Sequence, residues 1–311
     1  MTLDLIVKSK KKNKVPLSSA ICILLTLIML IYANEVKSGV KNGINLSLTT
    51  ILPTLFPFFI LSDLWIDLFE IKQNSILSKM FGRLFHINGT TISSFFIGII
   101  CGFPLGVKST VSHYKSNQIT KKELESVIGI INNPSLAFVI SGVGIGIYKS
   151  IFVGIILYII VIFSSFFIGL LFRPKCQNNN FPSEKVSQTF NITSSIISAG
   201  TNSIMVSSFI IFFSSITELL GGIVKNKFIK ILLSSFLEIS NATALISQYA
   251  DFSLATKLSL TAFALSFSGL SVHLQTFSIL PKEIQKGKYI LMKICQGFIS
   301  SIVTYFVFSQ K

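Results

Sequence analysis

Glu238 is the residue whose type and position most clearly indicate chemistry. It lies in the middle of an apolar stretch, residues 228–249, and three residues before Asn241. On a helix this spacing places the carboxylate and the amide on one face. A carboxylate in an apolar span is either protonated or paired, for example with Lys108 from the first half of the chain. We therefore expect Glu238 to bind a solute or to carry a coupling proton; the alternative is a structural polar contact between helices.

A second stretch, residues 95–147, mixes helix breakers and amides into apolar sequence. A backbone N–H or C=O freed at membrane depth has no water to bond, so such residues persist where they line a cavity inside the protein. Lys108 either binds an anionic group or extends to the membrane interface, and both interpretations stay open. The candidate solute-binding residues of this stretch are Gly102, Pro104, Gly106, Lys108, Asn132 and Asn133.

The second half contains a comparable polar segment, which reads ALSFSGLSVHLQ. Serine and glycine in membrane helices commonly serve packing, so a binding role for them competes with a structural one. The sequence has no HEXXH or GXSXG motif, no paired carboxylates and no cluster of His and Cys residues, so we expect no enzyme, metal site or cofactor. The candidate solute-binding residues of the second half are Glu238, Asn241, Ser268, Gly269, Ser271 and Gln275.

The composition tells which kind of element must position these residues. Half of the 311 residues are hydrophobic and only 13 % are charged, and the mean hydropathy is +0.71. The apolar residues come in blocks of about 20, the length that a helix needs to cross a bilayer. The net charge is +15. The Lys and Arg residues lie between the apolar blocks and form no basic face with interleaved aromatic residues, so we expect contact with anionic lipid and no binding of nucleic acid. The sequence predicts an all-α polytopic membrane protein.

Four intervals divide the chain. Residues 1–43 contain a basic cytoplasmic N-terminus, an uncleaved first transmembrane helix at about 17–33 and a short polar loop. Residues 44–172 and 190–311 form two repeats, and residues 173–189 are a polar linker between them. Residues 67–86 predict an interfacial amphipathic helix, and the spacing of Thr120 and Glu123 predicts a capping box.

The two repeats have one plan, which predicts a tandem duplication. GIICGFPLGVKST lies over SFLEISNATALIS, and we expect these segments to be broken helices. IINNPSLAFVIS lies over ALSFSGLSVHLQ, and these segments either cross once or form the tips of re-entrant hairpins. Re-entrant tips leave three spans in each half and invert the second half. The distribution of Lys and Arg favours that inverted arrangement, with about seven full spans and two hairpins.

The GFPLGVK, INNPS, LEISN and SFSGLSVHLQ segments resemble those of membrane proteins with a nucleoside-recognition gate domain. Within that group the chain is most similar to the sporulation integral membrane protein branch, the YlbJ-like proteins. The resemblance covers nearly the whole chain after the first helix. After the Asn pair this chain has Pro134-Ser135-Leu136, where the family pattern has a small residue and Gly-Pro.

The resemblance implies a transporter in which hairpins and broken helices of two repeats meet around a substrate. It implies a small polar or anionic solute, dipicolinate in the sporulation branch, moved by alternating access across a cell or forespore membrane. A coupling proton or Na⁺ and a homo-oligomer are open alternatives. The competing hypothesis is a non-transporting assembly or signalling protein that sporulation requires.

Overall fold

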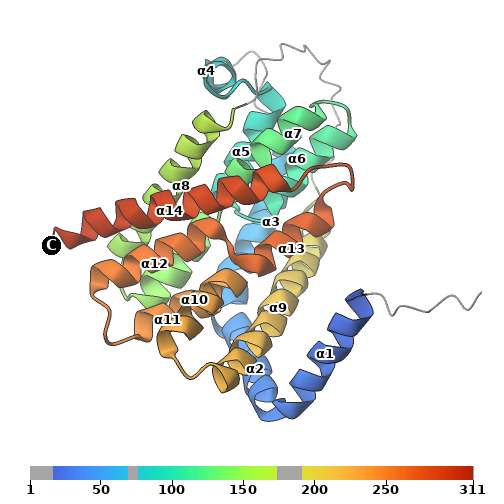
Figure 1. The fold of residues 1–311 in the computed structure, drawn as a ribbon. Coiled ribbons are helices and arrows are strands. Elements are labelled where there is room, and N and C mark those ends of the chain that lie inside the picture. The colour runs from blue at the N-terminus through green and yellow to red at the C-terminus, as the bar shows by residue number, and fades with distance from the viewer. Residues whose placement is uncertain (1–16, 69–75, 174–190, 311) are drawn as a thin grey trace, which may run out of the picture.

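The computed structural model describes residues 17–68, 76–173 and 191–310, so the basic N-terminus and nearly all of the expected linker lie outside the described residues. Every regular element in these ranges is a helix (Figure 1). Within them four helices are long and apolar enough to cross a membrane: Ala33–Leu61, Ile151–Leu171, Ile192–Ile223 and Gly287–Ser309.

The N-terminal part differs from the expected single span and polar loop. The elements are α1 (Leu17–Ile31), α2 (Ala33–Leu46), the π-helix η1 (Ser47–Ile51) and α3 (Leu52–Leu68). Helix α1 has 15 residues, fewer than the ~20 of a full crossing. The predicted loop is helix α2, because Gly39 and Gly43 let its backbone pack on the long helix α9 (Ile192–Ile223). A Cβ at Gly39 would lie 2.6 Å from the Ser214 carbonyl oxygen. Of the predicted interfacial helix, α4 (Ile76–Phe85) is described.

Helices α5 (Gly89–Ile100) and α6 (Leu105–Lys115) form an antiparallel pair. The hydroxyls of Ser94 and Ser109 are 2.8 Å apart. About one helical turn closer to the loop, a Cβ on Gly106 of α6 would lie 2.6 Å from the Gly98 Cα of α5. The prediction of one broken helix here is wrong, because Gly102 at φ +75° takes the left-handed conformation that lets the chain turn back.

Helix α7 (Lys121–Ile131) and the π-helix η2 (Phe138–Ile147) follow one line along helix α8 (Ile151–Leu171). Gly144 of η2 packs against Gly154, and near the break the Asn133 side-chain nitrogen donates to the Ser165 hydroxyl at 3.1 Å. Because both pairs fit one antiparallel alignment, α7–η2 is a single helix interrupted at residues 132–135. The Asn pair therefore lies in an interrupted helix and not at the tip of a hairpin.

The start of α7 agrees with the sequence. The Glu123 N–H donates to the Thr120 hydroxyl at 3.2 Å, so Thr120 caps the helix as predicted. The Glu123 carboxylate itself accepts bonds from Asn88 and Thr91, at 2.7 Å from the Asn88 N–H and 2.6 Å from the Thr91 hydroxyl. This carboxylate ties the start of α5 to the start of α7.

The second half contains five helices after α9. Its elements are α10 (Lys227–Leu237), α11 (Ile239–Gln248), α12 (Leu254–Phe267), α13 (Gly269–Ile279) and α14 (Gly287–Ser309). Helices α10 and α11 lie side by side and meet at Glu238 (Figure 1). Helix α12 packs along α14, where Ser259 bonds to Ser301 at 2.9 Å, and α13 reaches the start of α14 through the 2.8 Å bond between His273 and Tyr289. Here too the predicted broken helix is a pair of helices, α10–α11, and the predicted hairpin tip is the break of an interrupted helix, α12–α13.

The two antiparallel pairs, α5–α6 and α10–α11, lie toward opposite ends of the molecule. In Figure 1 the first occupies the upper half and the second the lower half, with α12 and α13 between them. The largest apolar cluster fills the middle, where Val139, Leu157, Val206 and Leu258 come from four different helices and are at most 8 % exposed. This core holds the two turns close to each other.

Candidate functional site

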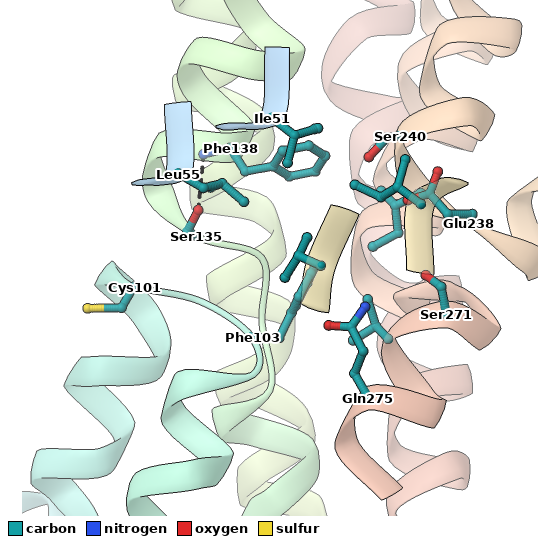
Figure 2. A pocket seen from close by; sticks show the side chains of 14 residues that line it. Ile51, Leu55, Cys101, Phe103, Ser135, Phe138, Glu238, Ser240, Ser271 and Gln275 are labelled. Carbon is teal, nitrogen blue, oxygen red and sulfur yellow. Dashed lines mark hydrogen bonds between the residues drawn. The ribbon is translucent and has the colours of Figure 1, made fainter. Parts of the chain in front are cut away.

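A small cavity lies where the two helix pairs and the two interrupted helices meet (Figure 2). The volume open to water-sized centres is about 30 Å³, which suits a few waters and no organic solute. In the described conformation the cavity is therefore too small for an organic solute. The lining residues are Ile51, Leu55, Cys101, Phe103, Ser135, Phe138, Val206, Ile210, Glu238, Ile239, Ser240, Ser271, Val272 and Gln275.

Glu238 lies in the cavity wall but not inside a helix. Its backbone is extended, with φ −154° and ψ 130°, so it ends α10 and begins α11. Its carboxylate accepts the Asn241 N–H at 2.8 Å and caps α11. A helix N-terminus favours an anion through its free N–H groups and its dipole. The side chain is 3 % exposed, so the cap holds this carboxylate in the protein interior.

The expected pairing of Glu238 with Lys108 is wrong. Lys108 is exposed on α6, whereas Glu238 is buried. In the described parts of the chain the ion pairs are Lys121–Glu125 and Lys230–Glu218. Asn241 is not in the cavity lining either, since its side-chain nitrogen donates to the Ser214 hydroxyl of α9 at 2.6 Å.

The polar part of the lining comes mainly from the second half. Figure 2 shows Glu238, Ser240, Ser271 and Gln275 on one side of the cavity, facing Phe103 and other apolar side chains. The Gln275 side chain is 2 % exposed, and its oxygen has no hydrogen-bond partner. The lining thus offers a carboxyl, hydroxyls and an amide, and it contains no Lys, Arg or His.

The first-half glycines shape the turn and do not face a solute. A Cβ at Gly102 would overlap the Ser135 backbone nitrogen, and one at Gly106 would meet the backbone of Gly98. Pro104 is buried between them at the start of α6. These predicted site residues therefore bring the turn close to the break in α7, and their neighbours Cys101 and Phe103 reach the cavity.

Ser268 and Gly269 form the break between α12 and α13, with φ of +78° and +66°. A Cβ at Gly269 would lie 3.2 Å from the Leu237 carbonyl oxygen, so the break packs on the turn that carries Glu238. Ser271 and Gln275, which stand one turn apart on α13, line the cavity. The predicted second-half site residues are thus close together, although Ser268 and Gly269 act through the backbone.

Asn132 and Asn133 lie outside the cavity lining, in a buried polar network. The Asn132 side-chain nitrogen donates to the Tyr289 hydroxyl at 2.8 Å and to the Thr276 hydroxyl at 3.0 Å. The Asn133 side-chain oxygen accepts from Gln296 at 2.9 Å. Both asparagines are 0 % exposed, so their amides join the interrupted helices to α14.

Sequence reasoning missed the α14 members of this network. Tyr289, Lys293 and Gln296 are at most 1 % exposed, yet they belong to the segment that hydropathy marks as a plain final span. The available signal was the spacing: Lys293 and Gln296 stand three residues apart in apolar sequence and so share a helix face. It also missed Ser135 and Ser240, which line the cavity.

Comparison with known proteins gives one informative relative. The chain is 26 % identical over 306 residues to the sporulation integral membrane protein YlbJ of Bacillus subtilis (strain 168), which covers 84 % of this chain and 75 % of that protein. This similarity supports the YlbJ-like family. No protein-family model matches the chain, so the nucleoside-recognition gate domain is not confirmed, and no solved structure matches it. The relative and the long apolar helices together make this chain an integral membrane protein.

Proposed function

We propose that this chain is a solute carrier of a membrane involved in sporulation, and not an enzyme. The observation that supports the proposal is the small cavity, whose walls come mainly from two helix turns and two interrupted helices. Irregular backbone at membrane depth is tolerated where it lines a cavity, and transporters bind their substrates between repeats at such breaks. The YlbJ similarity supports the link with sporulation.

The architecture proposed with this function is a pair of inverted repeats. The order of a helix pair, an interrupted helix and a long apolar helix occurs twice, in α5–α8 and in α10–α14. We take each pair as a re-entrant hairpin, one from each side of the membrane. The crossing segments are then α2–α3, α7–η2, α8, α9, α12–α13 and α14, and we take the 15-residue α1 as a seventh, shorter crossing.

The charge distribution agrees with this assignment. With α5–α6 as the hairpin, the α6–α7 connection returns to the side from which the pair entered. Lys115, Lys121 and Lys122 then share the cytoplasmic side with the α13–α14 connection, which contains Lys282 and Lys286. Figure 1 draws both connections at its upper end. A helix pair with its tip at Asn132 would place those three lysines outside, against the positive-inside tendency.

The lining sets a condition on the solute. Dipicolinate is the anionic solute that the family resemblance suggests, and the lining contains the Glu238 carboxyl and no cationic side chain. Two like charges in a closed, poorly solvated cavity repel strongly. A dianion therefore enters with Glu238 protonated, and the proton on Glu238 is the coupling ion that we propose.

Proteoliposomes containing the purified protein and radiolabelled dipicolinate test the proposal. We expect exchange across the membrane and accumulation driven by an inward proton gradient. Glu238→Gln, which fixes a neutral side chain, should keep exchange and lose the response to the gradient. Glu218→Gln is the matched control, because that carboxylate pairs with Lys230 outside the cavity.

Folded wild-type protein that gives no flux above empty liposomes would contradict transport of dipicolinate. The competing assembly or signalling role would then be tested in cells. Spores made without the protein but with normal dipicolinate content would exclude this solute, whereas a block earlier in spore formation would favour an assembly role.

A further inference from the structure

The interruption of α7 frees three carbonyl oxygens that the structure satisfies in different ways. The Ile130 oxygen accepts from the Ser165 hydroxyl at 2.8 Å, and the Asn133 oxygen accepts the Phe103 N–H at 2.8 Å. The Asn132 oxygen instead receives the side-chain amine of Lys293, with Nζ at 2.8 Å. A lysine amine thus occupies the carboxyl end of a half-helix in the protein interior.

This amine has oxygen partners and no carboxylate partner. Lys293 is 0 % exposed, and its second bond goes to the Gln296 side-chain oxygen at 2.7 Å. Neither ion pair in the described part of the chain includes it. Tyr289 and His273 are titratable neighbours, and His273 reaches the network through the Tyr289 hydroxyl. The carbonyl dipoles and the negative end of α7 are what offset a positive charge here.

Oxygen atoms at the carboxyl end of an interrupted helix are the ligands that inorganic coupling cations use in transporters. We infer that Lys293 is a tethered cation, which fills a monovalent-cation site at the break in α7. The site left without the side chain would present the Asn132 main-chain oxygen and the Gln296 side-chain oxygen. The Asn132 side-chain oxygen is a third acceptor, since it is buried and has no partner. Na⁺ is a monovalent cation that such a set of oxygen ligands would bind.

The inference can be tested without any transport assay, so its failure is distinct from failure of the proposed function. Purified full-length protein in detergent is heated in choline chloride and in NaCl at equal ionic strength, and binding of ²²Na⁺ is measured in parallel. The wild type should unfold at the same temperature in both salts. Lys293→Ala should unfold at a lower temperature in choline, recover roughly 3 °C or more in NaCl, and bind ²²Na⁺.

Met292→Ala is the matched control, because it removes a side chain of similar size from the next position of α14, where Met292 is 0 % exposed against Gly129. It should lower the unfolding temperature equally in both salts. If Lys293→Ala does not yield folded protein, Lys293→Ser is assayed in the same way, since it also vacates the amine position. Two outcomes would overturn the inference. In the first, neither Lys293 variant binds ²²Na⁺. In the second, the wild type binds ²²Na⁺ and Lys293→Ala does not.

Discussion

The Phe103 N–H donates to the Asn133 carbonyl oxygen at 2.8 Å. This bond joins the turn of the first helix pair to the break in α7, and it satisfies a carbonyl that the break leaves free. The Phe103 side chain lines the cavity, whereas the Asn133 side chain belongs to the buried network. Movement of the turn therefore acts on the network and on the cavity at once.

Gly102→Ala should destabilise the protein by about 1–3 kcal/mol, because φ at this position is +75° and an added Cβ overlaps the Ser135 backbone. Thermal unfolding in detergent measures the effect. Gly200→Ala is the control, since Gly200 lies within α9 with nothing inside 4 Å of the added Cβ. That variant should be about 0.5–1 kcal/mol more stable than the wild type. Equal unfolding temperatures for both variants would contradict the assigned turn.

Gln275→Leu should separate solute binding from folding. The Gln275 oxygen is buried without a partner, so an apolar residue of similar size leaves stability unchanged or raises it. Loss of the cavity amide should weaken solute affinity by about 10-fold or more. Asn132→Ala should do the reverse and lower the unfolding temperature, because the Tyr289 and Thr276 hydroxyls lose its amide. Binding titrations and unfolding curves of both variants check this pair.

Tyr289→Phe should cost about 1–3 kcal/mol of stability, since the lost hydroxyl bonds to Asn132 and to His273, both at 2.8 Å. Tyr305→Phe, on the same helix but 45 % exposed, should change stability by less than about 0.5 kcal/mol. Chemical denaturation of the two variants gives the comparison. A Tyr289→Phe protein as stable as the wild type would show that the network contributes nothing to folding.

Cys101 offers a direct reading of cavity opening. It lines the cavity and is 3 % exposed. In protein with the other three cysteines replaced by serine, a small water-soluble thiol reagent should react with Cys101 about 10-fold or more slowly in the folded protein than in the unfolded protein. A solute that occupies the cavity should slow the reaction further. Equal rates in the folded and unfolded protein would mean that the cavity stands open.

Hydropathy and breakers predict much of this fold. The apolar blocks identify the long helices α8, α9 and α14, and the unusual residues mark each of the four turns and breaks. What the sequence does not predict is the direction that the chain takes at each one. Gly102 turns the chain back and the Asn132–Asn133 pair lets it continue, yet both interrupt hydropathy equally. The difference lies in φ and in long-range bonds such as that from Phe103 to Asn133.

The candidate site was predicted in part for a similar reason. Glu238, Ser271 and Gln275 line the cavity, because a carboxyl or amide in apolar sequence usually faces the protein interior. In sequence, polar residues that belong to a buried network look the same as residues that face a solute. Asn132 and Asn133 belong to the network, and the sequence alone does not distinguish them from cavity residues. Lys293 was missed because one charge does not lower the mean hydropathy of α14 below that of a span.

The glycine contact between α2 and α9 holds these two helices in a fixed position relative to each other. Gly43 lies so close to α9 that a Cβ would come within 2.7 Å of the Ile211 Cα, one turn from the contact at Gly39. Two backbones in direct contact cannot slide past each other without losing that packing. The α2–α9 unit should therefore move as one body, and in the transport cycle proposed above we expect the opening path to the cavity to form on the side of the two turns.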